Sequence, residues 1–261
     1  MHDKVADLLV EASQELMLPR FKRLVSGDIA EKSPGELVTA VDRDMEAFLS
    51  QRLRALNHGS LVIGEEACSA DPSLLSQLDS DGDVWLVDPL DGTANFVAGS
   101  TEFGVLVALM RKGQCVSSWT YLPVSGALYS AELGAGAFAG GRRLQVTPKP
   151  NAKLRAIIKT RFLPPGVKGR VLAGASSLDL HPQENPAAVD YTNVCSGACD
   201  TVLYWRTLPW DHAGPALLLQ EAGGVVRRPD GAEYRVSERR EGLVVACNEQ
   251  SWQLARSTLF G

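Results

Sequence analysis

The spacing of apolar residues predicts two amphipathic helices near the N-terminus. Over residues 3–25, apolar side chains recur every three or four positions, and Gly27 follows the last of them. A second run with the same spacing covers about 42–56 and ends in the turn-forming residues 57–59. Each helix is therefore expected to bury one apolar face against the rest of the protein.

Short apolar runs bounded by turn residues predict strands in the next part of the chain. Two of them, within 60–64 and 84–88, lead directly into carboxylates. Over about 104–146, four further runs alternate with short glycine-containing connections, a pattern typical of an antiparallel meander. Two strands that each end in carboxylates can direct those groups toward one point.

The C-terminal part mixes helical and strand patterns. The expected strands are 156–160, 224–234 and 242–248, and the expected helices are 212–224 and 251–260. Residues 179–193 are polar and contain prolines, and the proline-rich stretch 162–166 is a candidate hinge. We expect one domain over residues 1–261, with an N-terminal α+β half of about 1–150 and a C-terminal α/β half of about 151–261.

Composition and charge exclude several classes of protein. The 261 residues are 45% apolar and 22% charged, which is ordinary for a globular protein with a sizeable core. A net charge of −5, with no run of Lys or Arg longer than two, argues against a nucleic acid polymer as partner. The N-terminal segment MHDKVADLLVEASQ carries charges throughout, so it is neither a signal peptide nor a membrane span. A cytoplasmic location without membrane association is the default expectation.

The five cysteines are expected to be reduced, structural thiols. Their number is odd and their neighbours are mostly apolar, which is typical of a reducing compartment. Cys195 and Cys199 form a C-x3-C pair, but zinc sites normally have two further ligands close by. A structural role is therefore favoured over a metal or redox site.

The candidate chemistry is concentrated in the stretch WLVDPLDGTANF. Asp88 and Asp91 come directly after a buried apolar run, where carboxylates are costly unless they are paired, hydrogen-bonded or bound to a metal. The proline between them ends the strand ladder, and Gly92 permits a close backbone approach. If a helix begins at Thr93, the N–H groups of Gly92 and Thr93 form an anion site. Hard oxygen ligands beside an anion site suit Mg²⁺ and a phosphate group.

Two interpretations of these carboxylates stay open on this stretch alone. Asp88 as a strand-end cap and Asp91 as an Asx-turn explain it about as well as a metal site does. The segments GEE and PWDHAG favour the metal, because they also place carboxylates at the edges of apolar segments. In PWDHAG, Asp211 precedes a helical run and can act as an N-cap while its outer face binds a cation. The hard oxygen donors available to Mg²⁺ are Glu65, Asp88, Asp91 and the main-chain carbonyl of Leu90.

Five motifs in this order resemble the inositol monophosphatase family of magnesium-dependent, lithium-sensitive phosphatases. They are ELVTAVD (36–42), GEE (64–66), WLVDPLDGTANFVAG (85–99), GAFAGGRRL (136–144) and PWDHAGPALLLQEAGGVV (209–226). The match covers most of the chain, and the ordered combination is highly specific. The resemblance implies an α/β (α+β) fold, a layered α-β-α-β-α sandwich of the type shared with fructose-1,6-bisphosphatase.

The resemblance also implies roles for individual residues. The positions similar to the family's ligands for Mg²⁺, which Mn²⁺ can replace, are Glu65, Asp88, Leu90, Asp91 and Asp211. The positions similar to its catalytic residues are Asp42 and Thr93, which orient and deprotonate the attacking water, and the supporting Glu66. The positions expected to contact phosphate or substrate are Gly92, Thr93 and Arg206.

One region departs from the family pattern. The segment ahead of Pro209 is interpreted as several residues too short, with 196–198 as the remnant of a family helix element and no acid at the position that contacts inositol hydroxyls. Arg206 stands nearby, and it is either a structural ion-pair partner or a contact to a second anionic group of the substrate. Inositol 1-phosphate is therefore not expected to be the best substrate.

The leading hypothesis is a Mg²⁺-dependent phosphomonoesterase that uses metal-activated water. Its candidate substrates are an inositol phosphate, a sugar phosphate, a nucleotide 3′-phosphate and histidinol phosphate. One alternative is a metal-binding regulatory or inactive member of the family. Another is a haloacid dehalogenase-type phosphatase, although that chemistry needs its second acid two residues after the first and not three. Assembly as a homodimer is left open.

Overall fold

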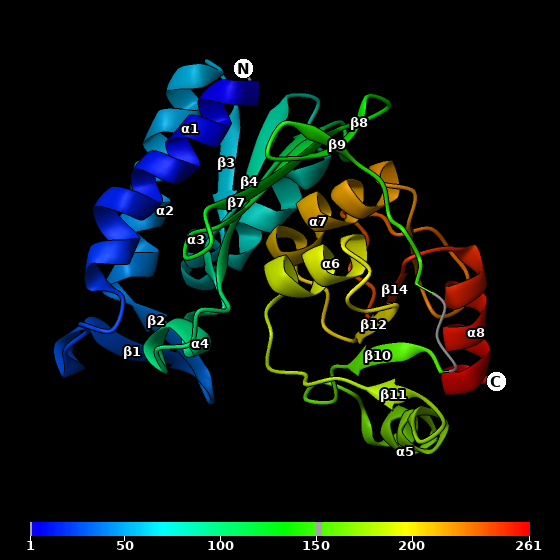
Figure 1. The fold of residues 1–261 in the computed structure, drawn as a ribbon. Coiled ribbons are helices and arrows are strands. Elements are labelled where there is room, and N and C mark those ends of the chain that lie inside the picture. Colours follow the sequence, from blue (N-terminus) through cyan, green and yellow to red (C-terminus); the bar gives the residue numbers. More distant parts are fainter. Residues whose placement is uncertain (1, 150–152) are drawn as a thin grey trace.

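Five alternating layers of helices and sheets make up the protein in the computed structural model, which describes residues 2–149 and 153–261 (Figure 1). The helices of the first layer are α1 (His2–Ala12) and α2 (Ala40–Leu56), those of the middle layer are α6 (Ala187–Cys195) and α7 (Pro209–Glu221), and those of the last layer are α5 (Pro165–Ala175) and α8 (Glu249–Phe260). A sheet lies between each pair of helical layers, so the α-β-α-β-α sandwich is confirmed. None of the helices in the described ranges is long and apolar enough to cross a membrane.

The first sheet is largely the expected meander. In the described chain it has seven strands in sequence order, and only the pair β3–β4 is parallel. The strands are β3 (Leu61–Gly64), β4 (Asp83–Asp91), β5 (Gly104–Arg111), β6 (Gln114–Leu122), β7 (Ala127–Glu132), β8 (Gly136–Ala139) and β9 (Arg142–Leu144). A separate hairpin of β1 (Ile29–Ser33) and β2 (Glu36–Thr39) leads into α2.

The second sheet follows the expected mixed pattern of the C-terminal part. Its order is β11-β10-β12-β14-β13, with strands β10 (Arg155–Ile158), β11 (Asp179–Leu180), β12 (Thr201–Tyr204), β13 (Val225–Arg227) and β14 (Leu243–Ala246). The hinge candidate 162–166 contains the start of α5, because a proline at the first helical position forfeits no helical hydrogen bond. The boundary expected at about residue 150 between the two halves lies outside the described residues.

The N-terminal helix is shorter than its apolar spacing suggested. Helix α1 ends at Ala12, and the chain continues through a π-helical turn (Ser13–Met17) and a 3₁₀ turn (Leu18–Arg20). Pro19 lacks an N–H and cannot continue an α-helical ladder, which explains why the expected helix over 3–25 stops early. Apolar residues of α1, α2 and this turn still form one core against the first sheet.

Strand β4 continues past the position where it was expected to end. It runs through Pro89 to Asp91, and its register against β5 shifts between Asp88 and Asp91. Proline is tolerated in a strand at such a bulge, because the missing N–H falls where the ladder is already interrupted. The bulge carries Asp91 to the point where the chain leaves the sheet.

Helix α6 is one of the elements that the sequence did not reveal. Eight of its nine residues are buried, including the polar Asp190 and Thr192, because the helix lies between the two sheets. A helix enclosed on all sides has no polar face, so its sequence shows no helical period. This is why 179–193 looked like an irregular polar segment.

The segment ahead of Pro209, expected to be several residues too short, contains both a helix and a strand. Helix α6 and strand β12 stand there in order, and β12 pairs with β10 and β14. Residues 196–198 are no remnant of a helix; they form the turn after α6, where Gly197 has a positive φ of 69°.

All five cysteines are buried free thiols. Burial raises the pKa of Cys195 to about 12, and it raises the pKa of Cys199, in the same C-x3-C pair, to a similar value. Thiols that hold their protons so strongly are poor nucleophiles and poor metal ligands. Their positions support the structural role expected from their apolar neighbours.

Candidate active site

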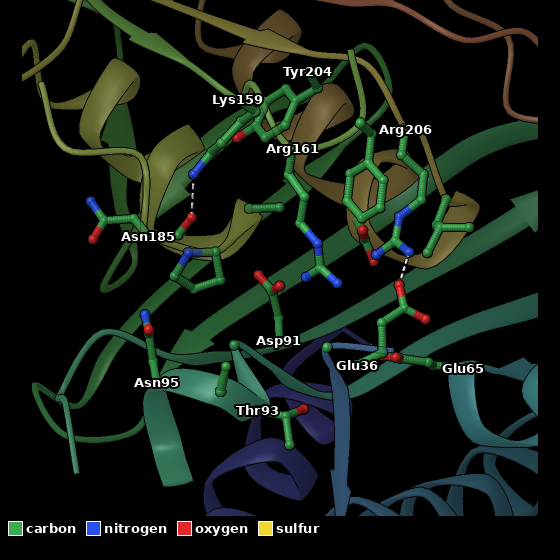
Figure 2. A pocket seen from close by; sticks show the side chains of 18 of the residues that line it. Glu36, Glu65, Asp91, Thr93, Asn95, Lys159, Arg161, Asn185, Tyr204 and Arg206 are labelled. Atoms are coloured by element: carbon green, nitrogen blue, oxygen red, sulfur yellow. Dashed lines mark hydrogen bonds and ion pairs between the residues drawn. The ribbon is translucent and has the colours of Figure 1, made fainter. Parts of the chain in front are cut away.

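A cavity of about 720 Å³ forms where distant segments of the chain meet (Figure 2). Its walls come from the β1–β2 hairpin, the start of α3 (Glu65–Ala70), the turn into α4 (Thr93–Val97), the loop ahead of α6, and the residues after β10 and β12. Pockets for small molecules measure about 300–1,000 Å³. The cavity is therefore large enough for a small metabolite.

The turn between β4 and α4 places Asp91 and Thr93 side by side on the floor of the cavity. Gly92 between them has a φ of +96°, a left-handed conformation that favours glycine. A Cβ at Gly92 would lie 3.0 Å from Cγ of Pro186 and 3.2 Å from the carbonyl oxygen of Glu102. The sharp turn and its close packing against the loop ahead of α6 both depend on this glycine.

Asp42 and Thr93 are in direct contact, although they come from α2 and α4. The hydroxyl of Thr93 lies 2.8 Å from Oδ1 of Asp42 and 3.1 Å from the main-chain oxygen of Leu90. The other carboxylate oxygen of Asp42 accepts hydrogen bonds from the N–H and the hydroxyl of Thr39, at 2.7 and 2.6 Å. Burial raises the pKa of Asp42, and these hydrogen bonds oppose the rise. Asp42 is thus a buried, oriented acceptor behind the Thr93 hydroxyl.

Four carboxylates gather at the floor, and the three aspartates among them are hard to ionise there. Glu65, Asp91 and Asp211 line the cavity, and Asp88 is buried nearby. Burial, with the charge of Glu65 adding to it, raises the pKa of Asp91 to about 7. The pKa values of Asp88 and Asp211 are raised well above their usual range by burial first and by neighbouring carboxylates second. Such mutual repulsion favours a bound cation.

Asp88 and Leu90 lie outside the lining of the cavity. Oδ1 of Asp88 accepts the N–H of Leu90 at 3.1 Å, so the turn bond expected of Asp91 is made by Asp88 instead. Asp91 makes no such local bond among the contacts of the described chain; its Oδ2 accepts the N–H of Ala188 on α6. The two aspartates therefore have different environments despite their shared motif.

Lys32 on the hairpin contacts both glutamates of the GEE segment. Its Nζ lies 2.9 Å from Oε1 of Glu65 and 2.5 Å from Oε1 of Glu66. Burial opposes the charge of Lys32, but the two carboxylates raise its pKa overall. Burial raises the pKa of Glu66 to about 7, with Lys32 acting in the opposite direction. Glu66 lies outside the cavity lining and supports Glu65 through this shared lysine.

A buried glutamate holds the first turn of α3. The N–H groups of Glu66 and Ala67 donate to the two carboxylate oxygens of Glu46, at 2.7 and 2.9 Å. Gly64, which precedes α3, has no Cβ, and a Cβ there would overlap the Glu46 carboxylate. The close contact between α2 and the end of β3 thereby sets the position of Glu65.

Asp211 lies in the first turn of α7 and not at its N-cap, which is Leu208. The expected capping role is therefore wrong, and the carboxylate is left to face the cavity. The next residue, His212, is buried, and burial lowers its pKa to about 3, so its ring is neutral. Its Nδ1 lies 3.2 Å from the hydroxyl of Tyr191 on α6. This contact joins α6 and α7 directly behind Asp211.

Two arginines and an aromatic ring form the wall that faces the carboxylates. Figure 2 shows Arg161 and Arg206 extending toward the side that bears Asp91 and Glu36. Arg206 forms an ion pair with Glu36, and its guanidinium carbon lies 4.1 Å from the ring centroid of Phe162. The guanidinium carbon of Arg161 lies 4.9 Å from the same centroid. Arg206 thus forms the ion pair that was one of its two interpretations, and it also lines the cavity.

Lys159 anchors the loop ahead of α6. Its Nζ lies 2.7 Å from Oδ2 of Asp190 and donates to the main-chain oxygens of Gln183 and Asn185. Oδ2 of Asp190 also accepts the hydroxyl of Tyr204 at 3.0 Å. Burial raises the pKa of Asp190 to about 6, and Lys159 opposes that rise. Asp190 is therefore an acidic residue beside β12, but its carboxylate is already bound by Lys159 and Tyr204.

Known proteins share both this sequence pattern and this fold. A profile of the inositol monophosphatase family matches residues 2–258. The chain belongs to the inositol monophosphatase family. It is 33% identical over 230 residues to inositol-1-monophosphatase of Mesorhizobium japonicum, covering 84% of this chain and 80% of that protein. It is 28% identical over 252 residues to the chloroplastic phosphatase IMPL1 of Arabidopsis thaliana, covering 90% of this chain but 64% of that longer protein.

A solved structure agrees with this membership at the level of fold. Extragenic suppressor protein suhB from Bartonella henselae has a TM-score of 0.83 and 24% identity, and the match covers 99% of this chain and 98% of that one. No layer of the fold is missing in such a match. Inositol monophosphatases are phosphatases, that is, phosphoric monoester hydrolases.

The inositol monophosphatase family is generally metal-dependent, and the residues at the cavity fit a divalent cation. In the described ranges, no three side chains of His, Cys, Asp or Glu already stand in a metal-binding group. The donor set is nevertheless all hard oxygen, as Mg²⁺ prefers. Three of its carboxylates also have raised pKa values in one another's presence, and a cation relieves that repulsion.

The fold gathers most of the residues that the sequence singled out. Those that line the cavity are Glu65, Asp91, Gly92, Thr93, Arg206 and Asp211, and those that lie next to it are Asp42, Glu66, Asp88 and Leu90. Sequence reasoning missed Lys32, Lys159, Arg161 and Phe162. Lys32 and Arg161 flank recognisable segments, but only the fold shows that Arg161 donates to the carbonyl of Pro34, 127 positions away.

Proposed function

We propose that this inositol monophosphatase family member is a Mg²⁺-dependent phosphomonoesterase that acts on a small phosphorylated metabolite. The observation that carries the proposal is the hydrogen bond between Asp42 and Thr93 at the edge of a buried carboxylate cluster. A polarised hydroxyl beside a cation site is the arrangement that phosphate ester hydrolysis by water requires.

The carboxylates Glu65, Asp91 and Asp211 would hold the cation from the cavity side. Asp88 and the carbonyl of Leu90, which lie next to the cavity, would complete the ligand set. Mg²⁺, or Mn²⁺ in its place, supplies positive charge for the phosphoryl oxygens and lowers the pKa of water. The N–H of Ala188 donates to Oδ2 of Asp91 and so fixes the carboxylate. Oδ1 is then the oxygen that would face the cation.

The chain's own groups position the reactants. The Thr93 hydroxyl orients the attacking water, and Asp42 behind it accepts the proton that the hydroxyl passes on. The N–H groups of Gly92 and Thr93, at the start of α4, bind a phosphoryl oxygen. Glu66 acts indirectly, because it shares Lys32 with Glu65 and so sets the charge around the cation site.

The alternative of a haloacid dehalogenase-type phosphatase has less support. That chemistry needs an accessible aspartate nucleophile. Asp88 is buried and bonded to its own turn, while one oxygen of Asp91 is taken by Ala188. A metal-binding protein without turnover stays the main competitor, and an activity assay separates the two.

The test is phosphate release from a panel of esters by protein first stripped with a chelator. The panel contains inositol 1-phosphate, a sugar phosphate, a nucleotide 3′-phosphate and histidinol phosphate. We expect turnover with Mg²⁺ or Mn²⁺, no turnover without them, and inhibition by Li⁺. Asp91→Asn should abolish turnover, while Asp44→Asn, at an exposed aspartate that is paired with Arg20 and does not line the cavity, should not. Metal-independent turnover, or full activity of Asp91→Asn, would overturn the proposal.

We also propose a cytoplasmic setting with small molecules as the partners. Five buried free thiols suit a reducing compartment, and a net charge of −5 offers little attraction for nucleic acid or anionic membranes. Homodimer formation remains open, and sedimentation of the purified chain measures it.

A further inference from the structure

The cavity has two electrostatically different walls. The floor carries the carboxylates, whereas Arg161 and Arg206 extend from the opposite wall (Figure 2). Phe162 stands between the two guanidinium groups, and its side chain is 38% exposed although it lines the cavity. Cation–π contacts between the Phe162 ring and both guanidinium groups restrict the motion of the two arginine side chains. The wall is therefore organised before a ligand binds.

The arginine wall keeps unbalanced positive charge. Arg206 is paired with Glu36, but Arg161 donates to a neutral acceptor, the carbonyl of Pro34, at 3.2 Å. Two guanidinium groups thus share one carboxylate. Lys159 is not counted as a further cation for a ligand, because its ammonium already contacts Asp190 and two main-chain oxygens.

Acceptors for neutral sugar hydroxyls are scarce on this wall. The hydroxyl of Tyr204 is buried and donates to Asp190, and the Glu36 carboxylate is already engaged by Arg206. Glu184 also lines the cavity, and its main-chain oxygen accepts a hydrogen bond from the side chain of Asn95. Figure 2 shows Asn95 away from Arg206. Guanidinium groups offer only donors, in a planar fork that matches phosphate oxygens.

On the basis of the proposed function, we infer that Arg161, Phe162 and Arg206 form a subsite for a second phosphate group on the leaving alcohol. The preferred substrates are then small bisphosphorylated metabolites. One phosphate lies over the carboxylate floor with its cation, and the other is held by the two arginines. The cavity, at about 720 Å³, has room for both groups and the carbon skeleton between them.

Matched substrate pairs that differ only in the second phosphate test this inference. Suitable pairs are adenosine 3′-phosphate and 3′,5′-bisphosphate, glucose 1-phosphate and 1,6-bisphosphate, and inositol 1-phosphate and 1,4-bisphosphate. For at least one skeleton, kcat/KM should be roughly tenfold or more higher for the bisphosphate, and the preference should shrink as salt rises. Equal or better use of the monophosphate in all three pairs would overturn the subsite.

A binding measurement separates the subsite from the chemistry. Calorimetry on the metal-free protein should show tighter binding of the bisphosphate than of the monophosphate of the same skeleton. If binding shows the preference but nothing is hydrolysed, the proposed function fails and the subsite stands. If monophosphates are hydrolysed without any preference in binding or kcat/KM, the subsite fails and the proposed function stands.

Substitutions on the wall show which groups carry the preference. In Arg161→Gln and Arg206→Gln, the ratio of bisphosphate to monophosphate kcat/KM should fall toward one, and Arg161→Lys should retain part of it. Arg170→Gln, on the exposed face of α5, is the matched control and should keep the wild-type ratio. A purely structural role would lower both substrates in parallel, and an unchanged ratio in both wall variants would contradict the inference.

Discussion

The main-chain N–H of Ala188 donates a 2.6 Å hydrogen bond to Oδ2 of Asp91, across 97 positions of the sequence. Asp91 ends a strand of the first sheet, and Ala188 opens the helix that separates the two sheets. The bond therefore ties a carboxylate of the candidate cation site to the middle layer of the fold. It also favours the ionised form of Asp91 in a place where burial opposes it.

This relationship predicts that Asp91 limits stability in the absence of metal. In Asp91→Asn the side-chain oxygen can still accept the Ala188 N–H, while the buried charge and its repulsion with Glu65 disappear. We expect metal-free Asp91→Asn to unfold at the same temperature as the wild type or higher, although it lacks activity. Thermal unfolding with and without Mg²⁺ measures this, and only the wild type should gain stability from the ion. A marked loss of stability in metal-free Asp91→Asn would show that the charge is structural.

The contact between Thr93 and Asp42 predicts a defect in turnover. Thr93→Ala removes the hydroxyl that lies 2.8 Å from Asp42, so kcat should fall about 10²–10⁴-fold, the usual contribution of general acid–base groups. Thr93→Ser keeps the hydroxyl and should recover most of the activity. Metal affinity, followed by Mg²⁺ titration of the activity, should change little. Loss of metal affinity with unchanged kcat at saturation would instead assign Thr93 a structural role.

We expect substitution of Gly92 to lower both stability and activity. In Gly92→Ala the left-handed backbone and the approach to Pro186 and the Glu102 carbonyl should cost roughly 1–3 kcal/mol of unfolding free energy. Activity should fall further, because the turn positions Asp91 and Thr93.

Gly126→Ala is the matched control for Gly92→Ala. Gly126 has a φ of +70° but open space around its Cβ position, and it lies in the turn between β6 and β7. This variant should lose some stability without losing activity. Urea unfolding and kcat/KM of the two variants test the difference, and equal activity losses would refute the role of the Gly92 turn.

The raised pKa of Asp190 predicts how the stability of the protein depends on pH. Burial raises its pKa from 3.8 to about 6, so the unfolded chain releases this proton before the folded protein does. The folded state should therefore lose stability as pH rises from about 4 to about 6, by on the order of 3 kcal/mol from this group. Asp190→Asn should flatten this part of the stability profile, whereas Asp179→Asn, at an exposed position, should not. Parallel urea-unfolding profiles of all three proteins would contradict the assignment.

We propose that residues 1–261 act as one domain, as the sequence suggested. A single buried cluster contains Leu106 of the first sheet, Val245 of the second, and Leu218 of α7 between them. Among the described residues, the two sheets share this core on the side of the middle layer. A single cooperative unfolding transition by two spectroscopic probes tests this proposal.

Local chemistry made several features readable from the sequence alone. Helix α2 was predicted because it buries one face and therefore shows a period of 3.6, and strands β5 to β7 were predicted because they are short apolar runs bounded by turn residues. The carboxylates at the strand ends stood out because charge is costly next to buried apolar residues. The ordered motifs then indicated the family, and the fold brings their acidic residues to one cavity.

Only the tertiary structure decided the features that depend on contacts between distant segments. Helix α6 was hidden because burial on all sides removes the amphipathic period, and β4 passes Pro89 because its partner strand accommodates a bulge. The same holds for the contact of Arg161 with Pro34, 127 positions away, which no local pattern encodes. Sequence periodicity reports which face of an element is buried, whereas the partner that buries it is chosen by packing of the whole chain. The acidic floor of the cavity was therefore predictable, whereas of its arginine wall only Arg206 was.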